Sequence, residues 1–350
     1  MIDPTVAVNG RYTRMHVSGV QRYATELVRH LVSADAVRWR LIVPPARIES
    51  GLPDVVPGSR WSGWKGHLWE QAALPMLSRQ AHADLLVNLC NWGPVGKRRQ
   101  LVALHDAATF VTPQFFSPAY LQWNRFATRR IGSTADRIAT LSQATRRQLV
   151  EYAGIDPNRV VVVPPGVDSD RFTPGLRTEG HRPPYLLLVG GHDRRKNAAF
   201  VMGWYGEARR RFGVDLRVVV HPRSQPHGSL RWEGPGVVVH EFLRDDELAS
   251  LYANAEVVLW PSYYEGFGLP LLEGMAAGTP FVSTAVGAAE ELAVDQRQVV
   301  PLDVDAWLEA LRWVLTNREH LSAPGRDRAV GYGWDRSASL LRAVIDEVAT

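Results

Sequence analysis

Several features that define common classes of protein are missing from this chain of 350 residues. It has one cysteine, Cys90, which excludes a disulfide framework and a metal site built from several thiolates. No apolar run approaches the roughly 18 to 20 residues that span a membrane. The first residues, MIDPTVAVNGRYTR, include an early acid and no apolar segment. We therefore expect no signal peptide and a cytoplasmic protein.

Familiar nucleotide-binding and hydrolytic motifs are also missing. There is no G-x-G-x-x-G, which weakens a dehydrogenase interpretation, and no G-x-x-x-x-G-K-[ST] phosphate loop. H-E-x-x-H and G-x-S-x-G are absent as well. Asp168 and Asp170 have the D-x-D spacing of some metal-dependent transferases, but a tripeptide in a linker is a very weak signal. We expect no metal site and no cofactor.

Lysine is scarce. Of the 40 basic residues only Lys65, Lys97 and Lys196 are lysines, and the others are arginines. The net charge of +4 is a mild excess. It indicates either a compositional bias toward arginine or a surface that meets anionic lipid or phosphorylated substrates. The chain has no basic tail, no Cys/His finger and no helix with a basic stripe, so we expect no nucleic-acid partner.

What the chain does contain is alternation of strand and helix patterns, once in each half. Apolar residues make up 45% and charged residues 22%, which is typical of a globular protein. The patterns predict strands at 39–43, 83–88, 100–104, 137–141, 159–163, 185–189, 216–220, 237–240 and 257–260. They predict helices at 19–32, 119–131, 198–212, about 269–277 and 334–349, and one that begins at Ser142. Such alternation indicates parallel sheets with helices on both faces.

The length predicts two domains, and residues 164–184, rich in Pro, Gly and charge, read as their linker. We predict Rossmann-like domains over 1–175 and 176–332, and a C-terminal helix at 333–350 that packs back toward the first domain. Doubly wound sheets bind ligands at the carboxyl ends of their strands. The expected site is therefore a cleft between the two domains.

The most informative segment is WPSYYEGFGLPLLEGMAAGTP, residues 260–280. Gly266 and Gly268 follow a strand and open a helix, and the free N–H groups of such a turn form an anion site. The helix is apolar apart from Glu273, and a buried carboxylate is costly unless it has a partner. A pair of ribose hydroxyls would suit it. The alternative partner is a buried backbone group or an arginine.

Glu265 and Glu273, inside EGFGLPLLEGMAAGTP, resemble the signature of the family-four retaining glycosyltransferases. Other segments also resemble the family, and they occur along the chain in the family's order. They lie at 18–31, 104–106, 140–168, 189–197 and 242–262. The resemblance covers nearly the whole chain. It implies the GT-B fold, α/β, in which two Rossmann-like doubly wound parallel-sheet domains face each other across a cleft. In that fold the first domain binds the acceptor and the second binds the nucleotide sugar.

The resemblance also implies roles for particular residues. Lys196 would contact the donor diphosphate, Arg195 would add charge, and Glu265 would lie beside the donor sugar. The alternative for 194–196 is a solvated run of charge. His105 would contact the sugar or the reacting centre, or be merely structural, and Asp106 would orient it or bind acceptor. The remaining donor-binding candidates are Gly19, Leu243, Asp245, Gly266, Phe267, Gly268, Leu269 and Glu273.

The sequence departs from the family pattern in two places. Gly191 stands where many relatives carry an arginine, a charge that Arg195 would replace. Pro165 replaces the usual asparagine before Gly-Val-Asp. For Gly19 the alternative to a phosphate contact is an ordinary helix N-terminus.

The predicted function is that of a retaining, metal-independent hexosyltransferase. It would move a sugar, for which we expect mannose or rhamnose, from a nucleoside diphosphate sugar to a hydroxyl. The acceptor would be a glycan, a glycolipid or a small molecule. The alternatives are a nucleotide-sugar epimerase or hydrolase of the same fold, and a non-catalytic nucleotide-sugar-binding protein.

The Trp-rich segment 60–75 has three interpretations. Trp61, Trp64 and Trp69 with Lys65 would make a peripheral contact at the inner face of the membrane, pack the first domain or line the acceptor site. Packing is the preferred one.

Overall fold

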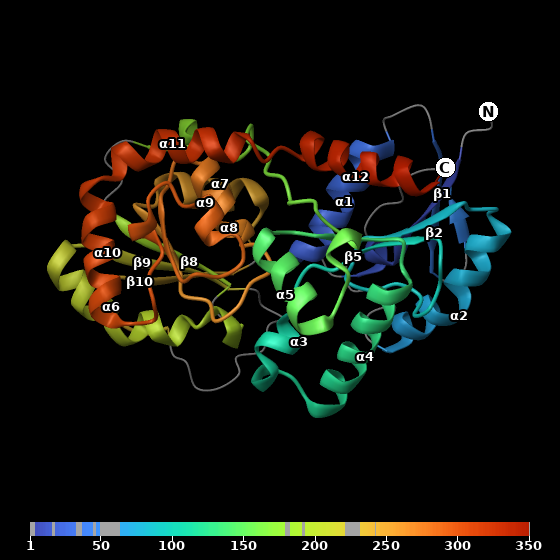
Figure 1. Cartoon of the computed structure of the whole chain (residues 1–350). Coiled ribbons are helices and arrows are strands. Elements are labelled where there is room, and N and C mark those ends of the chain that lie inside the picture. Colours follow the sequence, from blue (N-terminus) through green and yellow to red (C-terminus); the bar gives the residue numbers. More distant parts are fainter. Residues whose placement is uncertain are drawn as a thin grey trace. The chain divides into compact units, whose positions relative to one another are not determined.

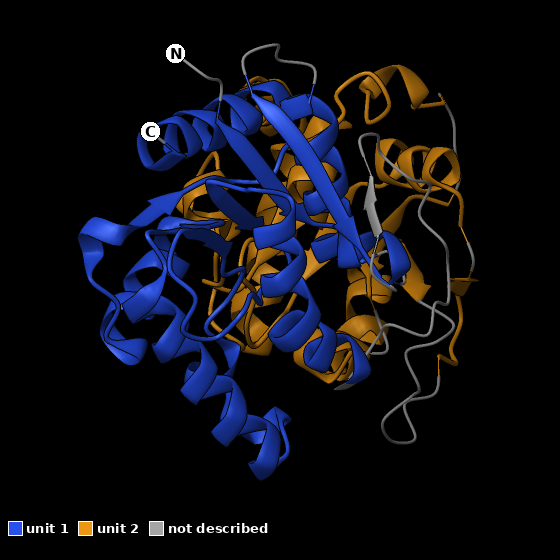
Figure 2. Ribbon diagram, turned by 90° about the vertical axis from the view of Figure 1, so that its right-hand side faces the viewer, with its two compact units in different colours: residues 1–166, 334–350 blue, residues 167–333 orange. Residues whose placement is uncertain are grey.

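The computed structural model describes residues 4–15, 18–32, 37–44, 47–49, 64–178, 183–190, 193–220, 232–241 and 243–349. The chain forms two compact units, residues 1–166 with 334–350 and residues 167–333 (Figure 2). The division therefore comes earlier in the chain than the predicted one after residue 175. The reason is that residues after Gly166 are tied to the second unit. The Val167 N–H donates to the Tyr332 carbonyl, and the Phe172 ring packs on Tyr252.

In the first unit the described residues form a sheet in the order β3-β2-β1-β4-β5-β6-β7. All neighbouring strands are parallel except β2 and β3, so the edge strand β3 departs from the all-parallel prediction. The bounds are β1 Thr5–Asn9, β2 Arg38–Val43, β3 Arg47–Glu49, β4 Leu85–Asn88, β5 Gln100–Ala103, β6 Arg137–Thr140 and β7 Val160–Val162.

The helices of the first unit cover both faces of this sheet. They are α1 Gly19–Val32, α2 Trp64–Gln80, α3 Ala108–Val111, α4 Pro118–Thr134, α5 Gln143–Ala153 and α12 Trp334–Ala349. Helix α2 buries Trp69, Leu74 and Leu77 against β1, β2 and β4. Helix α12 packs on α1, so the C-terminal helix belongs to the first unit (Figure 1).

The second unit contains a parallel sheet in the order β10-β9-β8-β11-β12. Its strands are β8 Tyr185–Val189, β9 Asp215–Val220, β10 Val237–Glu241, β11 Val257–Trp260 and β12 Phe281–Ser283. Its helices are α6 Ala198–Phe212, α7 Asp245–Asn254, α8 Leu269–Ala276, α9 Ala289–Leu292, α10 Val304–Thr316 and α11 Arg318–Val330. Both units are thus α/β with doubly wound sheets, which confirms the predicted fold class.

The two faces of the second sheet are covered by different helices. Helices α6 and α10 pack Trp204, Trp307 and Leu311 onto alternate residues of β8, β9 and β11. Helices α7 and α8 lie on the other side (Figure 1). Helix α8 comes very close to β11, because a Cβ on Gly274 would fall 2.7 Å from Val258 Cγ2. A side chain there would push α8 away from the strand.

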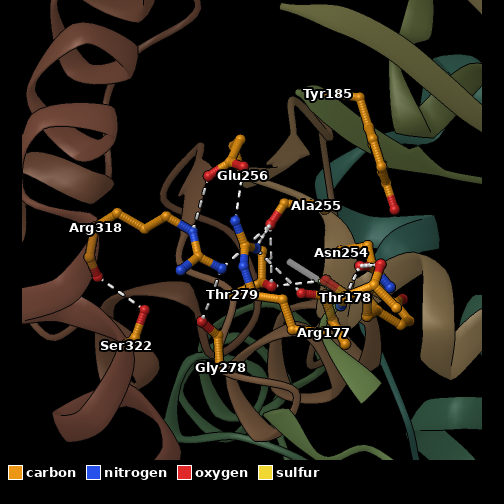
Figure 3. A network of polar contacts seen from close by, with 12 residues as sticks. Arg177, Thr178, Tyr185, Asn254, Ala255, Glu256, Gly278, Thr279, Arg318 and Ser322 are labelled. Carbon is orange, nitrogen blue, oxygen red and sulfur yellow. Dashed lines mark hydrogen bonds and ion pairs between the residues drawn. The ribbon is translucent and has the colours of Figure 1, made fainter. Parts of the chain in front are cut away.

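A polar network fastens the start of the second unit to the amino end of β11 (Figure 3). Glu256 accepts from Arg177 Nη2 at 2.8 Å and lies 3.1 Å from Arg318 Nε. Arg177 Nη1 also donates to the Ala255 carbonyl, and Thr178 donates to Asn254 Oδ1. Because β11 is parallel to its neighbours, this network lies at the end of the sheet opposite the strand ends that carry Lys196 and Glu265.

No helix formed by the described residues is long and apolar enough to cross a membrane.

Candidate functional site

The candidate site of the second unit lies where two neighbouring parallel strands end. Strands β8 and β11 pair directly, and the chain order of the sheet reverses between them. Ligands bind at such points in doubly wound folds. Lys196 lies in the turn η5, Arg194–Lys196, after β8, and Glu265 lies in the loop after β11. The fold therefore brings these two sequence-predicted residues to the same edge of the sheet.

Lys196 and Glu265 form an ion pair. Lys196 Nζ is 2.9 Å from Glu265 Oε1, and both side chains are about one-fifth exposed, 21% and 18%. The same carboxylate oxygen accepts from Ser262 Oγ at 3.0 Å. On another side, Nζ lies 3.9 Å from the centroid of the Trp260 ring. The ammonium thus has an anion and an aromatic face as partners, and it is still open to solvent.

The backbone around Lys196 is built to place this side chain. Gly190 has φ +87°, and a Cβ on it would come within 3.1 Å of Lys196 Cε. A glycine at this position adopts the left-handed backbone conformation without strain, and it leaves room for the aliphatic part of the Lys196 side chain. The Tyr263 N–H donates to the Arg195 carbonyl at 2.7 Å, which joins the turn after β8 to the loop after β11.

Arg195 has a different partner. Its Nη2 is 2.9 Å from Asp193 Oδ2, and its Nε donates to Asp193 Oδ1 at 3.3 Å. Burial by itself would raise the pKa of Asp193, but the hydrogen bonds and charge of Arg195 outweigh it and hold that pKa below its usual value. Arg195 thus pairs with Asp193 beside the site. Gly191, the position where the resemblance implies an arginine, lies outside the described residues.

The glycine-rich loop leads into α8 as the sequence predicts. Gly268 has φ +107° and immediately precedes Leu269, the first residue of the helix. Phe267 is buried, packs on Tyr332 and accepts the Ala288 N–H at 2.8 Å through its carbonyl. Gly266 and Leu269 are half-buried. The helix start therefore presents backbone N–H groups at the edge of the sheet that carries Lys196.

Glu273 is buried, with 6% of its surface exposed. Its Oε2 accepts a hydrogen bond of 2.9 Å from the Tyr252 hydroxyl, which comes from α7. The phenol is neither of the two partners that the sequence suggested. A carboxylate has room for several donors, so the Tyr252 contact is compatible with a further hydroxyl partner.

Leu243 and Asp245 lie at the beginning of α7. Leu243 is half-buried, and Asp245 is the first residue of the helix. The Asp245 carboxylate accepts from Arg171 Nη1 at 2.9 Å. This ion pair is exposed on both sides and contributes little to stability.

His105 lies in the first unit, two residues after β5, and is buried. Its Nε2 is 2.7 Å from the Leu89 carbonyl, and its backbone N–H donates to Asn91 Oδ1 at 2.6 Å. Because a carbonyl only accepts, Nε2 carries the proton. Burial lowers the pKa of His105 below its ordinary value. The ring is therefore neutral, and Nδ1 is its acceptor.

This burial predicts a pH effect on stability. The unfolded histidine takes up a proton near pH 6.5, while the folded one resists it, so this contribution is present above pH 6.5 and is lost as pH falls. His105→Gln keeps an N–H donor and should reduce the loss of unfolding free energy between pH 7 and pH 5 by up to about 2 kcal/mol. Urea unfolding at both pH values measures this. The exposed His320→Gln is the control, and an equal change in both variants would contradict the interpretation.

Three other candidates have local roles. Asp106 Oδ1 accepts the Ala108 N–H at 2.9 Å and so begins α3, whereas the His105 ring bonds to Leu89 instead. Gly19 is the exposed first residue of α1. Asp168 Oδ1 accepts the backbone N–H groups of two following residues. Within the described ranges no group of three His, Cys, Asp or Glu side chains could hold a metal ion.

Trp69 supports the packing interpretation of the Trp-rich segment, because it is buried in the core under α2. Trp61 and the side chain of Trp64 lie outside what the structure describes.

Sequence reasoning missed four residues that shape the site. Trp260 and Ser262 contact the ion pair, Tyr252 contacts Glu273, and Asp193 holds Arg195. Trp260 and Ser262 flank a proline in the segment that the sequence analysis singled out, which was the available signal. Tyr252 and Asp193 gave none, since their roles depend on side-chain geometry.

Comparison with known proteins agrees with this geometry. Residues 17–171 match the family model described as Glycosyltransferase Family 4, and residues 183–317 match the one described as Glycosyl transferases group 1. Together the two matches cover most of the chain, once in each unit. The chain belongs to the group 1 glycosyltransferases of GT-B fold.

Two curated relatives illustrate the likeness. A D-inositol 3-phosphate glycosyltransferase of Geodermatophilus obscurus is 34% identical over 248 residues, which is 63% of this chain and 54% of the relative. An MMP alpha-(1->4)-mannosyltransferase of Mycolicibacterium hassiacum is 31% identical over 247 residues, 66% of this chain and 59% of the relative. The chain thus spans little more than half the length of these relatives.

Two solved structures share the fold. A sucrose-phosphate synthase from Thermosynechococcus elongatus superimposes with a TM-score of 0.75 at 19% identity and 98% coverage of both chains. Anabaena HepE in complex with UDP-glucose gives a TM-score of 0.69 at 15% identity, covering 98% of this chain and 99% of that one.

Proposed function

We propose that this chain is a retaining, metal-independent glycosyltransferase that uses a nucleoside diphosphate sugar. The observation that carries the proposal is the Lys196–Glu265 ion pair at the strand ends where β8 meets β11, beside the glycine-rich start of α8. A phosphate-binding turn, a partly exposed cation and a carboxylate at one sheet edge suit a donor whose leaving group is a diphosphate.

Each residue has a proposed task. Lys196 and the N–H groups at the start of α8 neutralise charge that develops on the departing diphosphate, which is electrostatic catalysis. Glu265 then faces hydroxyls of the donor sugar, and Glu273, already oriented by Tyr252, accepts from the ribose. Leu243 and Asp245 lie near the nucleotide base. Arg195, in its bond to Asp193, supports the turn that carries Lys196.

The first unit contributes residues by family resemblance. Neutral His105 contacts the sugar as a hydrogen-bonding group, Asp106 lies on the acceptor side, and Gly19 lets a phosphate approach α1. We propose front-side displacement, in which the bond from the anomeric carbon to the leaving oxygen breaks as the acceptor oxygen attaches on the same face. The leaving phosphate takes the acceptor proton.

The names of similar proteins support the classes of substrate. One structural neighbour was solved with UDP-glucose, and the relatives are described as acting on inositol 3-phosphate or as transferring mannose. We propose a hexose donor, with mannose or rhamnose as first choices, and an acceptor that is a glycan, a glycolipid or a small hydroxylated molecule.

The experiment follows the donor by ³¹P NMR. The chain is incubated with UDP-glucose, GDP-mannose or dTDP-rhamnose, each with and without an acceptor panel of inositol 3-phosphate, simple mannosides and a lipid extract. A transferase releases nucleoside diphosphate only when an acceptor is present. The same release without acceptor would identify a hydrolase. A new nucleotide-sugar signal without release would identify an epimerase. Binding without any conversion would identify a binding protein.

We propose that a face of α4, and not the Trp-rich segment 60–75, makes the peripheral contact with an anionic membrane. Tyr120, Trp123 and Phe126 are exposed there, and α4 carries three arginines and no acid. Aromatic rings with basic residues are typical of surfaces that lie in the lipid headgroup region.

Vesicle sedimentation tests this surface. We expect the wild type to bind vesicles that contain phosphatidylglycerol, and W123A/F126A to bind at least about tenfold more weakly, since each buried ring contributes more than 1 kcal/mol. Tyr152→Ala, which removes an equally exposed ring from α5, should bind like the wild type. Equal losses in both variants, or no binding by the wild type, would exclude α4 as the contact.

A further inference from the structure

Trp260 is the last residue of β11 and is buried, with 1% of its surface exposed. It stands at the end of the strand that leads into the candidate donor loop. The Lys196 ammonium lies 3.9 Å from the centroid of its ring. The buried Trp260 side chain is held in the sheet, whereas the longer Lys196 side chain extends from the turn after β8. The indole ring therefore limits where the Lys196 ammonium can lie.

The choice of tryptophan here is unfavourable for packing alone. Its Nε1 is buried and has no hydrogen-bond partner among the residues that the structure describes. It lies under the glycine-rich turn, 3.7 Å from where a Cβ on Gly268 would stand. Leaving an N–H unpaired in the interior costs free energy, and phenylalanine or leucine would fill a strand end without this cost. What the indole offers in return is the most electron-rich face among the aromatic side chains, which attracts a cation.

The ring also differs from Glu265 in how it holds the cation. In the unliganded chain the Glu265 carboxylate pairs with Lys196. A donor diphosphate would compete with that carboxylate for the ammonium, because two anions close together repel each other. The neutral Trp260 ring does not compete by charge. It can keep the ammonium in place while the anionic partner changes from Glu265 to the diphosphate.

We propose that Trp260 is a positioning residue, which uses its ring face to hold the Lys196 ammonium where the donor diphosphate arrives. This inference rests on the proposed function, since it needs a diphosphate ligand. It extends that function by giving the strand-end tryptophan a role that acts through Lys196 alone.

A double-mutant cycle separates this role from a structural one. UDP, GDP, ADP and dTDP are titrated calorimetrically into the wild type, and the tightest ligand is then titrated into Trp260→Leu, Lys196→Met and the double variant. Trp260→Leu should weaken binding about 5- to 30-fold in the chain with Lys196, because that is the range of a partly desolvated cation–π contact. In the Lys196→Met background the same change should alter the affinity less than twofold. Trp260→Phe, which keeps a ring face, should recover most of the loss.

Because Trp260 is buried, the leucine variant can fail to fold. Fluorinated tryptophans give a second measurement, since fluorine withdraws electron density from the ring face and hardly changes its shape. Affinity should fall as fluorines are added in the wild type and stay constant in Lys196→Met. Equal losses in both backgrounds, or no loss in either, would overturn the positioning role while the proposed function stands. A wild type that binds none of the four nucleotides would overturn both.

Discussion

Lys196→Met is expected to weaken binding of the nucleoside diphosphate by about 10- to 100-fold, the worth of a hydrogen bond between charged groups. It should slow sugar transfer further, by about 10²- to 10³-fold in total, because the cation acts on charge that grows in the transition state. Two causes combine. The diphosphate loses its cation, and Glu265 loses the partner that lies 2.9 Å away. An uncompensated carboxylate would then repel the incoming phosphate.

Calorimetric titration of the diphosphate and the matching monophosphate measures the binding effect. In Lys196→Met the affinity for the monophosphate should fall much less than the affinity for the diphosphate, because Lys196 is assigned to the departing diphosphate group. K196M/E265Q should regain part of the affinity, since the repelling charge is removed. Lys65→Met, which removes an exposed lysine of α2, is the matched control and should bind like the wild type. Equal affinity of Lys196→Met and the wild type for the diphosphate would show that Lys196 does not contact the donor.

Gly287→Ala is expected to destabilise the second unit and to abolish nucleotide binding. Gly287 has φ +55°, and a Cβ there would lie 2.4 Å from the Phe267 carbonyl oxygen and 2.7 Å from its carbon. Both atoms belong to backbone, so no flexible side chain can move aside. The left-handed backbone costs about 1 to 2 kcal/mol for a residue with a Cβ. Overpacking adds roughly 1 to 3 kcal/mol, and any relief must displace the glycine-rich loop before α8.

Gly154→Ala is the matched control for this change. Gly154 also has a left-handed backbone, with φ +70°, but no atom of the described part of the chain lies within 4 Å of the place where its Cβ would stand. It should therefore show the conformational cost alone, about 1 to 2 kcal/mol in denaturant unfolding. Gly287→Ala should show both costs together, about 2 to 5 kcal/mol. Similar unfolding curves for the two variants, with nucleotide binding intact in both, would contradict the account of the loop.

Elements whose ends are marked by capping residues could be predicted closely from the sequence. The helix Ala198–Phe212 ends at a left-handed glycine, and α5 begins after Ser142, whose side chain accepts the Thr145 N–H. Helix α2 was missed because Pro75 and a mixed polar and apolar pattern hide its periodicity. Strand β12 was missed because its three residues are too few to show an alternating pattern, and α11 was missed because it contains Pro324.

The candidate site was predictable to the extent that it depends on strand order. Lys196 and Glu265 each follow a strand, and parallel strands that pair bring their carboxyl ends together. The hydrogen-bond partners of the individual side chains were not predictable. Arg195 turns to Asp193, Glu273 bonds to Tyr252, and His105 bonds to Leu89, and none of these follows from spacing in the sequence.

The second unit is proposed to bind a nucleoside diphosphate through Lys196 without a metal ion. The most direct measurement is thermal unfolding with UDP, GDP, ADP, dTDP and CMP, each with and without EDTA, for the wild type and Lys196→Met. One diphosphate should stabilise the wild type, by roughly 2.7 kcal/mol at about 100 times its dissociation constant. EDTA should not change this, and Lys196→Met should lose about half of it or more. No stabilisation by any nucleotide, or an equal shift in Lys196→Met, would contradict the claim.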